Sequence, residues 1–333
     1  MPRRPRPPLT LTILAVAAAA LFLVHLGWGT TDIPLADVWG GVFGGDSYDA
    51  NTVRVLRLPR ALSAVLAGAL LGLVGSAFQA FFRNPLADPY VVGVSSGAAV
   101  GGALAIVLGF GAGWSGWLTG IGPMIFATLG GLLALSLVIG LSVRRGVLEP
   151  QTLLLVGVVV GSMLSSLLSL ILLWGGKDTT VVLSWLLGHL TPAFMNKVHL
   201  MAVVLAIGAP ILILQGKRLN ALALGDETAG RLGVDTRMLK PIVLGLGAAM
   251  VAVTVGAIGI IGFLGLVAPH IARRLVGVDW RWSLVASGLI GSGLLCASDI
   301  LAQRVVPNTE VPVGIVTAII GAPFLVVLLR RGS

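Results

Sequence analysis

The chain has 333 residues, of which 56% are hydrophobic and only 11% are charged, and its mean hydropathy is +1.01. Soluble domains carry about 25% charged residues, so this composition excludes a water-soluble globular fold. The formal net charge is +9. No hydrophilic segment is long enough to form a basic soluble domain, which argues against a nucleic-acid-binding protein.

Long apolar runs follow one another along the whole chain. A helix needs about 20 apolar residues to cross a bilayer, and the sequence has room for about ten such helices and little else. We therefore predict an all-α polytopic membrane protein in which residues 1–333 form a single transmembrane domain. The predicted spans are 9–27, 59–82, 91–109, 121–143, 152–174, 198–215, 240–261, 264–276, 282–301 and 312–329.

Three segments need separate treatment. Residues 264–276 are too short to cross a bilayer alone, so we expect a broken or re-entrant element buried in protein. A short apolar helix near 180–189 is expected at the membrane surface. The run from Leu9 to Leu26 is long for a secretory signal and has no A-x-A-like site beyond it, which favours an uncleaved first span.

The basic residues orient the predicted bundle. If the N-terminus is cytoplasmic and the spans alternate, 16 of the 22 Lys and Arg residues fall on the cytoplasmic side, as the positive-inside rule predicts. Ten spans place the C-terminus on the same side. We expect a multi-pass protein of the cell inner membrane.

Motifs for an energy source, a metal or a cofactor are missing from the sequence. The string nearest to a phosphate-binding loop, Gly175-Gly176-Lys177-Asp178, lacks the first glycine and the hydroxyl of G-x-x-x-x-G-K-[ST]. The four histidines are scattered, and the single Cys296 allows no internal disulfide. We expect no catalysis, no bound metal and no cofactor in this chain, with ATP and magnesium on a separate partner.

Residues 219–234 form a polar island between apolar runs, so they lie at one end of the bundle. Leucines give its first half an apolar edge that a glycine can close, and an Asp-Glu pair can cap and start a second helix. Such a helix–turn–helix can receive a push from another protein, although an ordinary cytoplasmic loop is equally compatible. Its candidate residues are Leu219, Leu222, Leu224, Gly225, Asp226, Glu227, Ala229, Leu232 and Gly233.

Four further strings stand out. Arg57-Leu58-Pro59-Arg60 lies at the outer end of the second span, where two arginines project a positive patch outward or snorkel to the interface. Residues 79–89, QAFFRNPLADP, make a polar break at the inner end of that span. Residues 262–274 place Pro269 and His270 beside a basic pair. The last string, 299–323, contains Glu310, Pro312, Gly314, Thr317, Gly321 and Pro323.

Together these strings resemble the FecCD-type permeases, the membrane subunits of ABC importers for iron–siderophore complexes, haem and vitamin B12. The resemblance runs from about Arg57 to Leu329. It rests on five ordered motifs: RLPR, QAFFRNPLADPYVVGVSSGA, LNALALGDETAGRLGV, IGFLGLVAPHIARRLVG and EVPVGIVTAIIGAP. It implies a homodimer of ten-span subunits with a path at the dimer axis, two ATPase subunits below and one periplasmic binding protein above.

The resemblance also implies roles for residues. The segment at about 217–235 would be the coupling helices that enter grooves of the ATPases. Arg57 and Arg60 match positions that receive acidic residues of the binding protein. The family usually has an arginine four residues after the Asp of its ninth span. Here that position is Gln303 and Arg304 follows, so the docking patch would be shifted or weakened.

The path and its gate follow from the same resemblance. The fifth span and its flanking loops should line the shared path. Pro150 and Gln151 interrupt the apolar pattern just after a basic loop, so we place the inner gate at Glu149, Pro150, Gln151 and Thr152.

The segment 188–199 places His189, Met195 and His199 near the outer mouth. These side chains either touch a metal-containing substrate or are ordinary interfacial residues. An ion-coupled secondary transporter remains the alternative function, but it would need buried charges near the middle of the membrane. Siderophore, haem and cobalamin permeases share the motifs, so the cargo stays open.

Overall fold

A computed structural model describes residues 7–144, 147–191, 193–306 and 309–330 of the protein. Of the basic residues assigned to the cytoplasmic side, Arg3, Arg4, Arg6, Arg145 and Arg331 lie outside the described residues. The helices are α1 (Pro7–Gly27), α2 (Leu35–Phe43), α3 (Tyr48–Thr52), α4 (Leu58–Phe82), α5 (Val94–Val107), α6 (Gly122–Ser142), α7 (Pro150–Trp174), α8 (Thr179–Leu186), α9 (Met195–Leu214), α10 (Gly216–Ala223), α11 (Asp226–Arg231), α12 (Thr236–Ile258), α13 (Leu264–Val276), α14 (Trp280–Ala302) and α15 (Val313–Arg330).

Short elements complete the chain. They are a π-helix, η1 (Val53–Arg57), three 3₁₀ turns, η2 (Pro89–Val92), η3 (Gly116–Leu118) and η4 (Gly176–Asp178), and the strands β1 (Val143–Arg144) and β2 (Val147–Leu148). The two strands form an antiparallel hairpin in which Val143 pairs with Leu148.

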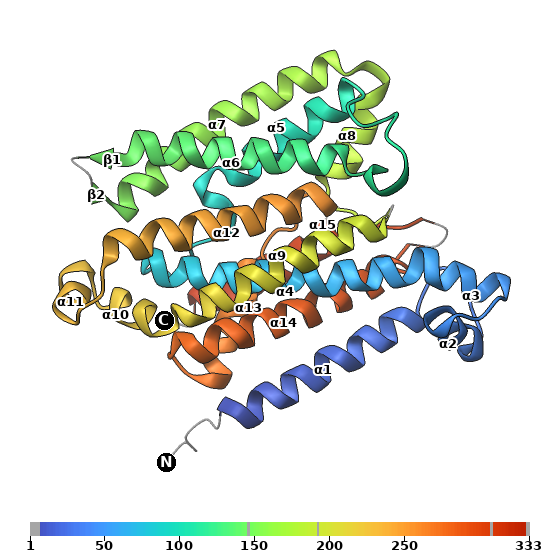
Figure 1. The fold of residues 1–333 in the computed structure, drawn as a ribbon, viewed down its shortest axis with the longest axis horizontal. Helices are drawn as coiled ribbons and strands as arrows, with labels where there is room; N and C mark the ends of the chain where they lie inside the picture. The colour runs from blue at the N-terminus through green and yellow to red at the C-terminus, as the bar shows by residue number, and fades with distance from the viewer. Residues whose placement is uncertain (1–6, 145–146, 192, 307–308, 331–333) are drawn as a thin grey trace.

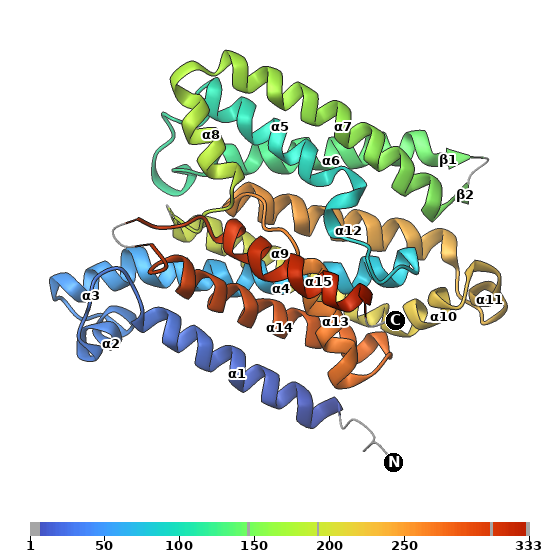
Figure 2. The ribbon, with the colours of Figure 1, turned by 180° about the vertical axis from the view of Figure 1, so that it is seen from behind.

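The helix bundle confirms the predicted all-α polytopic membrane fold. Seven helical stretches of the described chain are long and apolar enough to cross a membrane, and α5 and α15 are shorter apolar helices. With the 13-residue α13, these elements occupy the ten predicted spans. The long helices run along the long axis of the molecule, with α1 at one edge and α7 at the other (Figures 1 and 2).

The two ends of the bundle carry different elements. The start of α1, the end of α15, the α10–α11 pair and the β1–β2 hairpin lie at one end, whereas α2, α3 and α8 lie at the other (Figure 1). We call these the inner end and the outer end, after the orientation that the basic residues predict. The predicted surface helix near 180–189 corresponds to α8 at the outer end.

Close backbone contact holds the centre of the bundle together. A Cβ atom added at Gly72 of α4 would lie 2.1 Å from the Ser287 carbonyl oxygen of α14, and one at Gly291 would lie 2.1 Å from the carbonyl oxygen of Gly68. Small residues let helices approach this closely in lipid. A larger residue at these positions would push α4 and α14 apart.

The short α13 follows a broken segment, as the sequence predicts. Gly259 and Phe263 both have positive φ angles, +79° and +66°, and the chain reverses direction between them. The Tyr90 hydroxyl donates to the Ile261 carbonyl at 3.0 Å and accepts from the Ile261 amide at 3.2 Å. The break is therefore satisfied by protein, which non-helical backbone requires inside a membrane protein.

The second span begins earlier than expected. The sequence places its start at Pro59, but the helix runs without interruption from Tyr48 to Phe82. Pro59 lies in the first turn of α4, and the π-helix η1 directly precedes this turn. Proline lacks an N–H, and the wider π turn accommodates the loss. The short helices α2 and α3 were not predicted.

Candidate functional site

The α10–α11 pair forms the tip of the inner end. Leu219 and Leu222 are fully buried against the bundle, whereas Leu224 is 67% exposed. The predicted apolar edge of three leucines is therefore wrong for Leu224. Residues three apart share a helix face, but Leu224 follows Leu222 by only two and points away.

Hydrogen bonds fix the base of α10 to the start of α14. The Asn220 side chain donates to Asp279 Oδ1 at 2.9 Å and accepts from the Trp280 amide at 2.9 Å. Asp279 also accepts from the Arg281 guanidinium, and this hydrogen bond is the main reason that its pKa falls to about 2. The carboxylate therefore stays ionised at neutral pH and holds α10 in place.

The turn between the two helices differs from the predicted one. Gly225 has φ +112° and itself occupies the N-cap position of α11, and Asp226 is the first helical residue with no capping hydrogen bond. The predicted capping role of Asp226 is therefore wrong. Its carboxylate instead forms an ion pair with Lys240 of α12 at 2.7 Å and lies 3.9 Å from Arg83 at the end of α4.

The outward face of α11 is open to solvent. Ala229 is buried beneath the helix, while Glu227 and Arg231 pair with each other at 2.6 Å on its exposed side. Leu232 is 62% exposed, and Gly233 reverses the chain with φ +79°. Together with Leu224, this leucine gives the tip two unpartnered apolar side chains, which suit contact with another protein.

The predicted gate residues lie at the same end, between the β1–β2 hairpin and α7. Pro150 is the first residue of α7 and is buried, whereas Glu149 and Gln151 are exposed. The Thr152 hydroxyl donates to Glu149 Oε2 at 2.9 Å. This side-chain bond fixes the first turn of the helix.

Lys240 connects the segment of the predicted gate, residues 148–152 and called the gate segment below, to the α10–α11 pair. Its side chain is only 7% exposed, and its ammonium donates to the carbonyl of Leu148 at 2.9 Å while it pairs with Asp226 at 2.7 Å. Leu148 directly precedes Glu149 in the chain. A single buried cation thus joins the gate segment to α11.

One face of α7 is exposed along its whole length and carries four serines. Each hydroxyl donates to a carbonyl one turn earlier in the helix, at 2.8 to 3.1 Å: Ser162, Ser165, Ser166 and Ser169. The hydroxyl oxygens keep free lone pairs on this face, which also carries large exposed apolar side chains such as Leu155, Met163 and Leu173. The face is therefore mixed in polarity.

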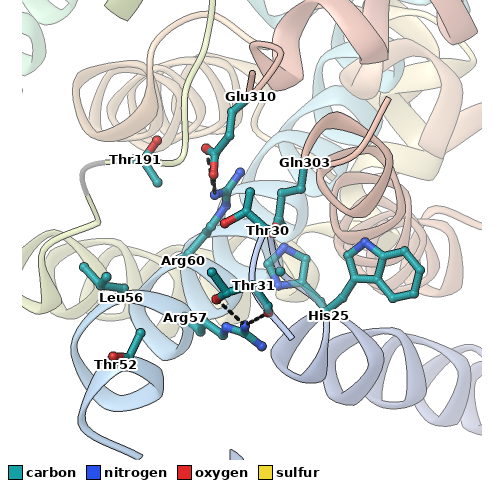
Figure 3. A pocket seen from close by; sticks show the side chains of 12 residues that line it. His25, Thr30, Thr31, Thr52, Leu56, Arg57, Arg60, Thr191, Gln303 and Glu310 are labelled. Carbon is teal, nitrogen blue, oxygen red and sulfur yellow. Dashed lines mark hydrogen bonds and ion pairs between the residues drawn. The ribbon is translucent and has the colours of Figure 1, made fainter. Parts of the chain in front are cut away.

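A buried charge cluster lies at the outer end, beneath a cavity of about 270 Å³ (Figure 3). Arg60 binds Asp299 through two hydrogen bonds of 2.8 and 3.0 Å and binds Glu310 through two more of 3.0 and 3.1 Å. Asp299 also contacts His25 Nε2 at 2.7 Å and Gln303 Nε2 at 3.0 Å. Three helices, α1, α4 and α14, and the segment before α15 therefore meet at one carboxylate network.

The predicted outward-facing arginine patch is wrong as a description of Arg57 and Arg60. Both residues are only 8% exposed. Arg57 donates to the backbone carbonyl of Gly27 and to that of Thr31, the latter marked in Figure 3. Both guanidinium groups therefore join α4 to neighbouring segments of the same chain.

Arg304 is the exposed arginine of this region. It pairs with Asp32 at 2.6 Å, and its guanidinium carbon lies 4.6 Å from the centre of the Trp28 ring. Gln303, at the position where the resembled family usually has arginine, instead donates to the buried Asp299. The exposed positive charge of this region therefore lies one residue later than in the family pattern, on Arg304.

The structure does not gather the three candidate metal contacts into one site. His189 lines a cavity with α8, whereas Met195 and His199 line a separate, open hollow beside η3. Among the described residues, no group of three or more His, Cys, Asp or Glu is placed to hold a metal ion.

Sequence reasoning missed Lys240, His25 and Asp299 as organising residues. The isolated Asp299 in an apolar span was the available signal, because a buried carboxylate needs a cationic partner. No local pattern indicates that Lys240 reaches two separate segments.

Known proteins are similar to this chain along nearly its whole length. The model of the FecCD transport family matches residues 16–331. The cobalamin import system permease of Halobacterium salinarum is 36% identical, with 97% of this chain and 89% of the relative covered. The hemin transport system permease of Yersinia pestis is 34% identical, with 98% and 97% covered.

A solved structure gives the same result in three dimensions. It is described as an inward-facing ABC transporter of the metal-chelate type, and it superposes with a TM-score of 0.84 at 30% identity, covering 98% of this chain and 99% of that chain. The ferric enterobactin permease of Escherichia coli is 36% identical over 96% of this chain and 94% of its own length. This chain belongs to the FecCD transport family of ABC importer permeases, in which ATP hydrolysis takes place on partner subunits.

Proposed function

We propose that two copies of this chain form the translocation path of an importer for a large metal chelate: an iron–siderophore complex, haem or cobalamin. Two ATP-binding subunits would bind the inner end and one periplasmic binding protein the outer end. The termini would then be cytoplasmic, and the chain itself would carry no cofactor. An ion-coupled mechanism is disfavoured, because the buried Asp299 lies near an outer helix end and is fully paired.

The observation that carries this proposal is the connection between α11 and the gate segment. Lys240 contacts Asp226 of α11 and the carbonyl of Leu148. A displacement of α11 by an ATPase would therefore act directly on the segment that begins α7. The exposed leucines Leu224 and Leu232 offer the ATPase an apolar contact on the opposite side.

The α7 helix is our candidate for the wall of the path. It lies at the edge of the bundle, and its exposed face carries the four serines described above. A second copy packed near this face would enclose a channel of mixed polarity with the gate residues at its inner end. A C2 dimer places the same surface of both copies at the axis.

At the outer end, Arg304 is the best candidate for contact with acidic residues of a binding protein. It is exposed and its partner Asp32 is more exposed still, so the pair can exchange partners at little cost. Arg57 and Arg60 would support this surface from beneath. An Arg304→Glu variant should bind the binding protein more slowly at low salt, since rim charges act mainly on association rates.

Cysteine crosslinking tests the inner assignment. A cysteine at Leu224 or Leu232 should crosslink to cysteines in the ATPase, with a yield that changes when nucleotide binds. A cysteine at the buried Leu219 is the matched control and should not react. Equal yields at all three positions would remove α10–α11 as the ATPase contact.

A further inference from the structure

The outer end contains a second, larger cavity of about 610 Å³ between the α5–α6 loop, α8 and the start of α9. Ligand pockets commonly have volumes of 300–1,000 Å³. Its walls are mainly aromatic and aliphatic, and Phe110 and Trp114 remain 46% and 38% exposed. Phe110 stacks on Phe126 on one side, with ring centres 4.9 Å apart, and the exposed part of both rings presents flat apolar surface.

The charged group of this cavity, Lys197, is a cation without a carboxylate partner among the described residues. Lys197 donates to the Ala257 carbonyl at a long 3.3 Å, and its ammonium lies 5.5 Å from the centre of the Phe194 ring. No ion pair joins Lys197 to a carboxylate of the described residues. By contrast, the little-exposed Arg60 and Lys240 each pair with an acid.

Further hydrogen-bond donors line the same cavity. Trp185 lines it, and its buried indole N–H has no hydrogen-bond partner among the described residues. The hydroxyls of Thr180, Ser184 and Thr191 also come from lining residues. His189 Nδ1 donates to the Ser184 carbonyl at 2.8 Å. Among the described residues, no Asp or Glu lines the cavity.

We propose that this cavity binds an amphiphilic oxyanion, a molecule with a carboxylate or phosphate group attached to a flat or apolar body. The anionic group would pair with Lys197, which has donors left over, and would accept from the neighbouring N–H and O–H groups. The body would lie against Phe110, Trp114 and Phe194. Charge-assisted hydrogen bonds are the strongest available to such a group.

Two sources supply this chemistry at the outer face of a membrane: an anionic chelate in transit and the headgroup of an anionic lipid. The site stands on its own residues and does not depend on the proposed import function. Failure of transport in reconstituted vesicles would leave it unaffected, and loss of binding at this cavity would leave the coupling assignment unaffected.

The test uses the full chain in nanodiscs of phosphatidylcholine and iron(III) deuteroporphyrin, a flat dicarboxylate, as the probe. Binding is measured by quenching of tryptophan fluorescence. Lys197→Met should weaken binding at least tenfold, and Lys197→Arg should stay within about threefold of the native chain. The matched control is Lys177→Met, which removes an exposed lysine at the same end and should change nothing.

A second comparison requires no mutation of the lysine. The dimethyl ester of the same porphyrin keeps the ring and loses both charges, so it should bind the native chain at least tenfold more weakly. Trp185→Phe, which removes only the indole N–H, should weaken the dicarboxylate about threefold. Equal binding of acid and ester would overturn the proposal, even if Lys197→Met failed to fold.

Native mass spectrometry separates the two sources. In nanodiscs that contain phosphatidylglycerol, the native chain should retain this lipid after release and Lys197→Met should lose it if the site takes a lipid phosphate. Porphyrin binding that depends on Lys197 without lipid retention identifies the chelate as the ligand. Either result supports an oxyanion site. If neither the porphyrin nor the lipid requires Lys197 for binding, the proposal is wrong.

Discussion

Replacing Lys240 with methionine should separate ATP hydrolysis from transport. Methionine keeps an unbranched apolar side chain in the buried space but removes the ammonium that contacts both Asp226 and the Leu148 carbonyl. The α10–α11 pair would still be held to α14 through Asn220 and Asp279. The ATPase should therefore still bind and turn over, while its motion reaches the gate less effectively.

The expected size of this effect follows from the two contacts. A hydrogen bond from a charged donor is worth about 1.5–3 kcal/mol. The ion pair contributes less, about 0.5–1 kcal/mol, because the Asp226 side chain is 40% exposed to solvent. A loss of about 2 kcal/mol from the coupling between ATPase and gate corresponds to roughly a 30-fold change in the gate equilibrium.

The assay measures transported chelate per ATP hydrolysed in proteoliposomes. Lys240→Met should lower this ratio at least tenfold with ATPase activity within about twofold of native. Lys240→Arg should recover most of the ratio, and Arg237→Met should not alter it, because that residue is exposed on the same helix. An unchanged ratio in Lys240→Met would refute the connection between α11 and the gate.

Three further predictions follow from the same structure. Gly225→Val forces a β-branched residue to φ +112° and should reduce coupled transport without abolishing expression. Gln151→Cys should crosslink to its twin in a nucleotide-dependent way, and a yield that ignores ATP would move the gate elsewhere. Asp279→Asn should lower stability at pH 7 by about 1 kcal/mol after solvent screening. The folded pKa is depressed to about 2. This contribution is therefore complete above the unfolded pKa of about 4 and is lost as pH falls through the folded pKa. Thermal unfolding of the native and Asp279→Asn proteins across this pH range would show the loss.

Features set by composition and spacing could be predicted from the sequence. The ten spans follow from runs of about 20 apolar residues, and the short α13 from the length of 264–276. The polar island was located correctly because charged residues do not stay inside a lipid-facing span. The sequence could also have shown which leucines of α10 share a face, since Leu224 cannot share one with both Leu219 and Leu222.

Pairings between distant segments could not be predicted. Arg60 and its partners Asp299 and Glu310 are 239 and 250 residues apart in sequence, so the sequence suggested an exposed patch where the fold buries a paired cluster. The same holds for Lys240, whose two contacts come from separate segments. The start of the second span was missed because Pro59 resembles a helix start, while the π turn of η1 continues the helix through it.

We propose that this chain moves a metal chelate with energy received at its inner end. Uptake of radiolabelled iron chelate, haem or cobalamin should be measured in proteoliposomes that contain the chain, its ATPase and its binding protein. We expect uptake of one of these chelates to require all three components and ATP. Uptake without the ATPase, driven by an ion gradient, would instead identify an ion-coupled transporter.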